Sequence, residues 1–184
     1  MEKREFRRLV KERFKAISEE QKQSKSRAVV EQLRWLLSQR EASVVALFAP
    51  MADEVQIGEL CRELAKSGRF RVVLPRVLDM GPSAEMEFFD YIPSQMAEGA
   101  YGIFEPQGEK VCPASDIDVM IVPGVAFDRT GGRLGRGKGY YDRYISREGF
   151  RAECIGVCYD FQLFDKIPTE QHDRVMDIVV SNNL

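Results

Sequence analysis

The chain has a single histidine, His172, and four cysteines among its 184 residues, and this scarcity limits the kinds of site that it can build. One histidine excludes a histidine-rich metal centre, and the cysteines lack the spacing of metal ligands. A Ser-His-Asp triad built on His172 would lack the G-x-S-x-G turn that usually carries the serine. Cys154 and Cys158 fall in an apolar, strand-like run, so we expect both thiols to be small core residues.

Long apolar runs and a surplus of one charge are also missing. No run approaches the roughly 18 apolar residues that a membrane-spanning helix requires. The N-terminal residues MEKREFRRLVKERFK contain no apolar segment of a signal peptide, so we expect a cytoplasmic protein without a membrane partner. Basic side chains number 27 and acidic side chains 29, which gives a net charge of −2. Nucleic-acid-binding domains usually carry a basic surplus, so we expect no nucleic-acid partner.

Apolar residues recur at the spacings of helices and short strands along the chain. Helices are predicted over residues 3–16, 18–39, 57–67 and 139–147, and strands over residues 43–49, 71–74, 86–91, 118–122, 152–159 and 177–180. We expect the strand over residues 71–74 to stop at Pro75. Alternating helices and strands predict one α/β domain over residues 1–184, in three layers, with a largely parallel central sheet and helices on both faces. Trp35, Phe48 and Phe127 lie inside periodic segments, so we expect them in the core.

Residues 122–145 combine the features of an anion-binding loop. Five glycines lie among residues 131–139 and alternate with the cations Arg133, Arg136 and Lys138. A predicted strand precedes the stretch, and a predicted helix start follows it. Glycines let backbone N–H groups approach an anion, while the cations and the helix start add positive charge. Cations this close would repel one another without an anion to face, so we expect a nucleotide here.

The glycine-rich stretch is close to a P-loop but does not match one. Residues 132–138 satisfy G-x-x-x-x-G-K, yet Gly139 stands where the magnesium-binding hydroxyl belongs. The last glycine of a dinucleotide fingerprint is missing too, because Tyr140 occupies its place. A kinase or ATPase with a P-loop-like site remains an alternative. So does a non-enzymatic RNA-binding protein that stacks bases on Tyr140, Tyr141 and Tyr144.

Residues 123–142 read P-G-x-x-F-D-x-x-G-x-R-L-G-x-G-x-G-Y-Y-D without a gap, and this motif resembles that of the 5-formyltetrahydrofolate cyclo-ligase family. Weaker similarities follow in the family's order over nearly the whole chain. They are Lys3 with Arg7, residues 18–26, residues 50–54 (PMADE) with Pro75 and Arg76, residues 101–106 (YGIFEP), and Ile167-Pro168 with His172-Asp173.

The resemblance implies ATP- and magnesium-dependent closure of 5-formyltetrahydrofolate, monoglutamated or polyglutamated, to 5,10-methenyltetrahydrofolate, with release of ADP and phosphate. In such a reaction the γ-phosphoryl of ATP activates the formyl oxygen, N10 attacks the formyl carbon, and phosphate leaves. The protein mainly has to align the two ligands and neutralise the charge that develops. The implied ligands are therefore ATP, the folate and Mg²⁺.

The same resemblance assigns roles to particular residues. The implied ATP site comprises Lys3, Arg7, Arg133, Leu134, Gly135, Arg136, Gly137, Lys138, Gly139 and Tyr140. The implied folate contacts are Met51, Glu54, Arg76, Arg136, Gly137, Lys138, Gly139 and Tyr140. Arg136 and Lys138 are the implied catalytic residues. Magnesium prefers carboxylate oxygens, so Asp142 and Asp173 are the expected metal ligands. Without the family pattern, Asp142 would instead be read as a partner of the helix dipole, and Asp173 as a turn residue.

Overall fold

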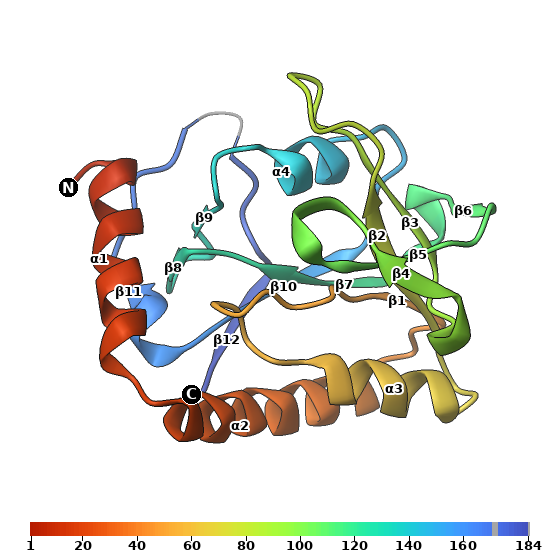
Figure 1. Cartoon of the computed structure of the whole chain (residues 1–184), viewed down its shortest axis with the longest axis horizontal. Coiled ribbons are helices and arrows are strands. Elements are labelled where there is room, and N and C mark those ends of the chain that lie inside the picture. The colour runs from red at the N-terminus through yellow and green to blue at the C-terminus, as the bar shows by residue number, and fades with distance from the viewer. Residues whose placement is uncertain (171–172, 184) are drawn as a thin grey trace.

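Seven strands form the central sheet of the structure, a computed structural model that describes residues 1–170 and 173–183. They are β1 (Val44–Ala46), β2 (Arg71–Val77), β3 (Met86–Asp90), β6 (Val111–Cys112), β7 (Val119–Pro123), β10 (Glu153–Cys158) and β12 (Ile178–Ser181). Their order is β12-β10-β7-β1-β2-β3-β6 (Figure 1). The first five strands in this order run parallel, and β3 and β6 are antiparallel to their neighbours. The prediction of a largely parallel sheet is confirmed.

Helices cover both faces of this sheet, as the sequence predicts (Figure 1). They are α1 (Lys3–Ala16), α2 (Glu19–Ser38), α3 (Gly58–Lys66) and α4 (Tyr140–Ile145). Successive strand residues point to opposite faces, so Val45 packs in the core layer under α2 and α3, while Ala46 belongs to the core layer on the side of α4. The α2 side chains Leu33 and Leu37, one helical turn apart, are buried against the first of these layers. None of the helices in the described residues is long and apolar enough to cross a membrane.

Shorter strands and 3₁₀ helices lie beside the central sheet, and two of these strands contribute to a third core. A three-stranded sheet contains β8 (Ala126–Asp128), β9 (Arg133–Leu134) and β11 (Leu163–Phe164), and β4 (Met96–Glu98) pairs with β5 (Phe104–Pro106). Short 3₁₀ helices occur at Pro93–Gln95, Ala100–Gly102, Ala114–Asp116 and Asp160–Gln162. Helix α1 packs on the small sheet through Phe6 and Val10, and the rings of Phe6 and Phe164 meet edge to face at 4.9 Å. The sequence analysis did not predict these short strands.

Two sequence expectations are wrong. Strand β2 does not stop at Pro75 but continues to Val77. The N–H of Leu47 donates to the Val73 carbonyl, so the backbone polar groups of Val73 point toward β1. Those of Pro75, two residues later, point to the same side. Because β1 ends before this point, β2 needs no N–H donor at position 75. Trp35 is 64% exposed rather than in the core, because it lies on the outer side of α2. Phe48, Phe127, Cys154 and Cys158 are buried as expected, and His172 lies outside the described residues.

The turn between β8 and β9 is built around the carboxylate of Asp128, which is only 2% exposed. Its oxygens accept hydrogen bonds from the Thr130 N–H (2.9 Å) and hydroxyl (2.7 Å), the Gly132 N–H (2.9 Å) and the Ile167 N–H (3.1 Å). A Cβ at position 132 would lie 2.5 Å from the Asp128 Oδ2, so this close approach requires glycine. Burial by itself would raise the pKa of Asp128, but these hydrogen bonds outweigh it and hold the pKa below its ordinary value.

The Asp128→Ala variant should be less stable than the wild type by about 3 kcal/mol at pH 7, because several buried donors lose a charged acceptor. The lowered pKa means that this stabilisation is present above the unfolded-state value of about 3.9 and is lost as the pH falls through the folded-state pKa. Urea unfolding at pH 7 and at successively lower pH values measures the difference. The exposed Asp165→Ala serves as the control. A variant as stable as this control at pH 7 would contradict the anchoring role of Asp128.

Candidate active site

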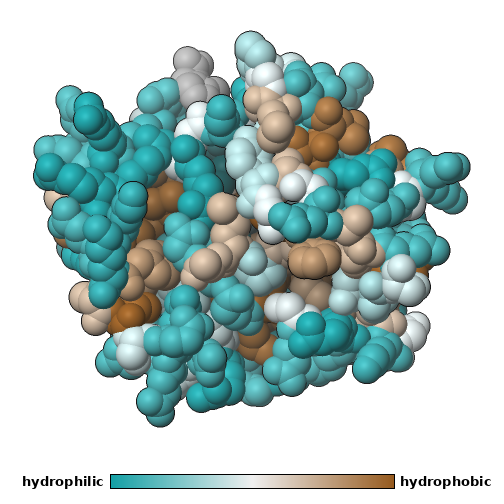
Figure 2. All heavy atoms as spheres, in the orientation of Figure 1, coloured by the Kyte–Doolittle hydropathy of each residue, from teal (hydrophilic) through white to brown (hydrophobic). Residues whose placement is uncertain are grey.

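A cavity of about 830 Å³ lies beyond the carboxyl ends of the parallel strands. Phe48 and Ala49 follow β1, Val77 ends β2, and Pro123 with Gly124 closes β7 at its wall. Helix α1, the glycine-rich loop and the start of α4 form a further part of the wall. In Figure 2 the outer side of α1 is hydrophilic, whereas hydrophobic residues gather toward the middle of the same face. Parallel sheets usually bind ligands at this edge, and the volume lies within the roughly 300–1,000 Å³ of small-molecule pockets.

The cavity brings together almost all of the residues that the sequence assigns to the site. These are Lys3, Arg7, Met51, Glu54, Arg133, Leu134, Gly135, Arg136, Gly137, Lys138, Gly139, Tyr140, Asp142 and Asp173. They come from the first helix, the segment after β1, the glycine-rich loop and the C-terminal part of the chain. Their convergence from distant parts of the sequence makes this cavity the candidate active site.

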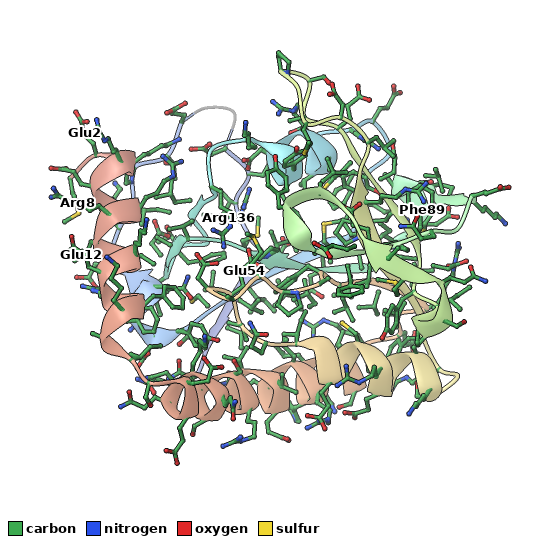
Figure 3. The ribbon with its side chains drawn as sticks, viewed as in Figure 1. Glu2, Arg8, Glu12, Glu54, Phe89 and Arg136 are labelled. Carbon is green, nitrogen blue, oxygen red and sulfur yellow. The ribbon has the colours of Figure 1, made fainter. Side chains whose placement is uncertain are left out.

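Arg76 is the exception, because it does not belong to the cavity wall. Its guanidinium lies 3.6 Å from the centre of the Phe89 ring and donates to the carbonyls of Pro106 and Gly108, each at 2.9 Å. The neighbouring β2 residues Pro75 and Val77 line the cavity, so the alternation of the strand directs Arg76 to the opposite side. Figure 3 places Phe89 far from the central pair of Glu54 and Arg136. The expected folate contact of Arg76 is not supported by this position.

The glycine-rich loop leaves β9 and passes in front of α1. Gly137 has a φ of 100°, a backbone conformation that favours glycine, and a Cβ there would lie 3.6 Å from the Arg7 guanidinium. The Arg7 Nε donates to the Gly135 carbonyl at 3.0 Å, so α1 holds the loop directly. The hairpin of β8 and β9 separates the loop from β7, whereas a P-loop follows its strand at once. The loop is therefore not a P-loop.

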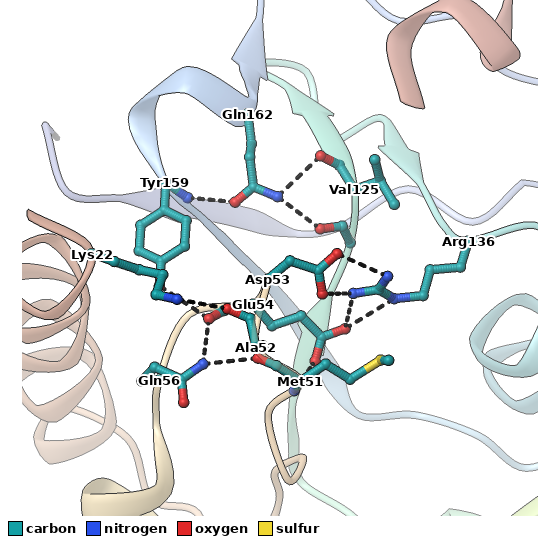
Figure 4. Close-up of polar contacts among 11 residues, drawn as sticks. Lys22, Met51, Ala52, Asp53, Glu54, Gln56, Val125, Arg136, Tyr159 and Gln162 are labelled. Atoms are coloured by element: carbon teal, nitrogen blue, oxygen red, sulfur yellow. Dashed lines mark hydrogen bonds and ion pairs between the residues drawn. The ribbon is translucent and has the colours of Figure 1, made fainter. Parts of the chain in front are cut away.

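Arg136 crosses the cavity mouth and pairs with two carboxylates of the segment after β1 (Figures 3 and 4). Its Nη2 lies 2.5 Å from Asp53 Oδ1 and 3.2 Å from Glu54 Oε1, and its Nη1 lies 3.1 Å from Asp53 Oδ2. The other oxygen of Glu54 accepts the Met51 N–H at 2.9 Å. These contacts join the glycine-rich loop, which the sequence assigned to both ATP and folate, to the segment that it assigned to folate alone.

Glu54 is the buried member of this network, with 9% of its surface exposed. Burial raises the pKa of the Glu54 carboxyl above its ordinary value, although the Met51 N–H and the charge of Arg136 act in the opposite direction. Its main-chain carbonyl accepts a hydrogen bond from the Tyr159 hydroxyl at 3.0 Å, and this bond anchors the segment after β1 to the core. A buried carboxylate held on a rigid segment and open to a cavity can accept hydrogen bonds from ligand N–H groups.

Two further ion pairs involve the expected metal ligands. The Lys3 ammonium lies 2.7 Å from Asp173 and 3.0 Å from Glu170. The Arg133 guanidinium, which is 5% exposed, donates to Asp142 Oδ2 at 3.0 Å and to the Pro123 carbonyl at 3.1 Å. Protein carboxylates therefore relieve the repulsion that the sequence analysis expected among the loop cations. Lys138, by contrast, is exposed at the cavity wall.

The cavity offers carboxylates for a metal ion but not a complete protein cage. No group of three or more His, Cys, Asp or Glu residues that could hold a metal occurs in the described part of the chain. Asp142 and Asp173 nevertheless line the same cavity. Magnesium usually keeps several waters and takes one or two carboxylates together with substrate phosphates. These residues fit that mode of binding.

Some residues of the site were missed from sequence. The Tyr101 hydroxyl lies 3.1 Å from the Tyr140 hydroxyl, and the buried Glu105 accepts the Val77 N–H at 3.1 Å, and both line the cavity. Gln162 does not line the cavity, but its Nε2 donates to the carbonyls of Gly124, which does, and Val125 at 3.1 and 3.0 Å (Figure 4). Residues 101–106 contribute to the family resemblance, which could have directed attention to the first two. No local pattern marks Gln162.

Comparison with known proteins gives a consistent result over the whole chain. The model of the 5-formyltetrahydrofolate cyclo-ligase family matches residues 1–182. The chain is 32% identical over 177 residues to the 5-formyltetrahydrofolate cyclo-ligase of Escherichia coli, covering 94% of this chain and 96% of that protein. The solved structure of Aquifex aeolicus 5,10-methenyltetrahydrofolate synthetase is 34% identical and has a TM-score of 0.86, with coverage of 100% of this chain and 91% of that one.

A second solved structure, a 5,10-methenyltetrahydrofolate synthetase from Mycoplasma pneumoniae, is 25% identical with a TM-score of 0.79, and 99% of each chain is covered. The similarity therefore includes both the sequence motif and the arrangement of the elements that carry it. It favours neither the P-loop enzyme nor the RNA-binding alternative. The chain belongs to the 5-formyltetrahydrofolate cyclo-ligase family.

Proposed function

We propose that the protein catalyses the ATP-dependent closure of 5-formyltetrahydrofolate to 5,10-methenyltetrahydrofolate. One observation carries the proposal: the glycine-rich loop and the Met51–Glu54 segment line the same cavity, of about 830 Å³. Phosphoryl transfer requires the γ-phosphate and the formyl oxygen to meet in line, so the two ligands have to share one space. Family membership supports the same reaction.

The reaction proceeds in two displacements. The oxygen of the N5-formyl group attacks the γ-phosphorus of ATP. The bond from this phosphorus to the oxygen that bridges it to the β-phosphate breaks, and ADP leaves. N10 then attacks the formyl carbon of the resulting iminium phosphate. The carbon–oxygen bond breaks, phosphate leaves with that oxygen, and N10 loses its proton. No covalent bond to the protein forms, so alignment and charge stabilisation account for the catalysis.

The positions of the cavity residues support a division of roles. Glu54, with Met51 beside it, would accept the amino and ring N–H groups of the pterin. The loop N–H groups, Arg136 and Lys138 would surround the phosphates, and the two cations would stabilise the charge of the transferring phosphoryl. Lys3 and Arg7, one turn apart on α1, would approach the phosphates from the other side. The buried Arg133 would position the loop through Pro123 and Asp142.

The remaining parts of the proposal concern the ion, the form of the substrate and its location. Asp142 and Asp173 would hold Mg²⁺, which neutralises phosphate charge when bound. The two carboxylates, which now pair with Arg133 and Lys3, line the same cavity as the loop. The use of polyglutamated folate and a cytoplasmic location stay predictions from the sequence.

The purified protein should convert 5-formyltetrahydrofolate with ATP and magnesium to the methenyl product and form one ADP per turnover. The near-ultraviolet band of methenyltetrahydrofolate and a coupled ADP assay measure the two products. Reactions without ATP and without folate are the controls. Folded protein that forms no methenyl product under these conditions would contradict the proposed function.

The Lys138→Ala variant should lose about 10²-fold in kcat, because a cation that meets the transferring phosphoryl is removed. Its thermal stability should change little, since the side chain is exposed in a loop. The matched control is Lys110→Ala, an exposed lysine that does not line the cavity. If kcat stays near the wild-type value while the melting temperature falls, Lys138 is structural.

The Asp142→Asn and Asp173→Asn variants should each need more magnesium for half-maximal activity, because each loses a carboxylate that would contact the ion. Folate binding without ATP should remain nearly unchanged. Asp142→Asn also removes the partner of the buried Arg133, so we expect it to be less stable as well. Magnesium titrations at a temperature where both variants are folded separate the two effects, with Asp165→Asn as the control. Unshifted curves for both variants would mean that neither carboxylate assists the ion.

A further inference from the structure

A second cavity, of about 650 Å³, adjoins the first one. Phe48, Ala49, Met51, Tyr101 and Ile103 line both cavities. The shared residues place the two cavities side by side, with Met51 at the boundary between them. The second cavity lies between the start of α3 and the segment that contains β4, the 3₁₀ turn at Ala100–Gly102 and Phe104.

The chemistry of the second cavity differs from that of the first. Its walls are mainly apolar, with Leu74, Pro93, Met96 and Phe104 added to the shared residues. Among the described residues that line it, Arg62 is the only charged one. No described carboxylate forms an ion pair with Arg62, whereas Arg133 and Arg136 at the first cavity are both paired. The second cavity therefore suits an apolar ligand with an anionic end.

The guanidinium of Arg62 is directed toward the beginning of its helix. Its Nη1 lies 3.8 Å from the place that a Cβ on Gly58 would take, and Gly58 is the first residue of α3 and also lines the cavity. No side chain caps this end of α3. The helix start adds partial positive charge beside the guanidinium, so an anion there is favoured by both groups.

We infer that the second cavity binds the p-aminobenzoylglutamate half of the folate, with Arg62 as the partner of a glutamate carboxylate. The inference rests on the proposed function, in which the pterin contacts Met51 and Glu54. The benzoyl ring is bonded to N10 and lies between the pterin and the glutamate. The residues shared with the first cavity, the apolar lining and the single cation of the second cavity match the pterin, the benzoyl ring and the glutamate in chemistry.

A nucleotide does not fit the second cavity as well. A triphosphate needs several donors or cations, which the glycine-rich loop of the first cavity provides and the second cavity lacks. A glutamate carboxylate needs only one charge-assisted partner, and a guanidinium is suited to it in geometry. Arg62 is thus a residue for substrate specificity rather than for phosphoryl transfer.

The experiment compares Arg62→Ala, Arg62→Lys and Lys66→Ala with the wild type on two substrates. Lys66 is an exposed cation one turn later on α3 that lines neither cavity, so it controls for the loss of charge. The substrates are 5-formyltetrahydrofolate and 5-formyltetrahydropteroate, which lacks the glutamate. Arg62→Ala should raise the KM for the first substrate about 5-fold, the size expected for one partly exposed ion pair, and leave kcat within about twofold.

With 5-formyltetrahydropteroate, the KM of Arg62→Ala should equal that of the wild type, because the carboxylate is absent. Arg62→Lys should recover part of the lost affinity, and Lys66→Ala should behave as the wild type with both substrates. An equal rise in KM for both substrates, or no rise with Arg62→Ala, overturns the inference. Melting temperatures show that each variant is folded.

The failure of the proposed function would look different from the failure of this inference. A wild type without turnover refutes the reaction. Calorimetric binding of 5-formyltetrahydrofolate without ATP then tests whether the second cavity holds the glutamate. Affinity that falls in Arg62→Ala and not in Lys66→Ala supports the glutamate site. Equal affinities, or no binding to the wild type, overturn it.

Discussion

The carboxylate of Asp128 is the contact on which the geometry of the active site depends. It fixes the turn that leads into β9, from which the glycine-rich loop leaves, and it also holds the Ile167 N–H of the C-terminal segment. That segment continues to Asp173, the partner of Lys3 on α1. A buried carboxylate is stable only when its oxygens are hydrogen-bonded, so these parts of the chain are fixed relative to one another.

Charge balance within the protein is the second constraint. Arg136 is held by Asp53 and Glu54, and Arg133 is held by Asp142, in each case with a carboxylate from outside the run of glycines. The guanidinium of Arg133 is buried, and without such a partner its burial would be strongly unfavourable. A glycine-rich loop with three cations is therefore stable before any phosphate binds. Phosphates that enter the cavity have to compete with these carboxylates or join them through a metal ion.

The sequence predicted the features that have a local pattern. The helices and the central strands other than β6 carry apolar patterns that the sequence shows, and the motif of residues 123–142 locates the loop. Strands β8, β9 and β11 have two or three residues each, too few for a period to appear. The continuation of β2 past Pro75 depends on where β1 ends, and the outward direction of Arg76 depends on that continuation. Such properties come from neighbouring strands and are not encoded in the segment itself.

On the roles proposed above, the binding of the two ligands is coupled through Glu54. The pterin N–H groups would bind the same buried carboxylate that accepts the Arg136 guanidinium. A pterin bound at Glu54 would share this carboxylate, so Arg136 would keep Asp53 as its partner while part of its charge became available to another group. An incompletely paired guanidinium at the wall of a cavity attracts an anion strongly. On these roles, the charge that develops on the transferring phosphoryl would be met by a cation whose original partner the folate shares, and catalysis would be favoured only when both ligands are present.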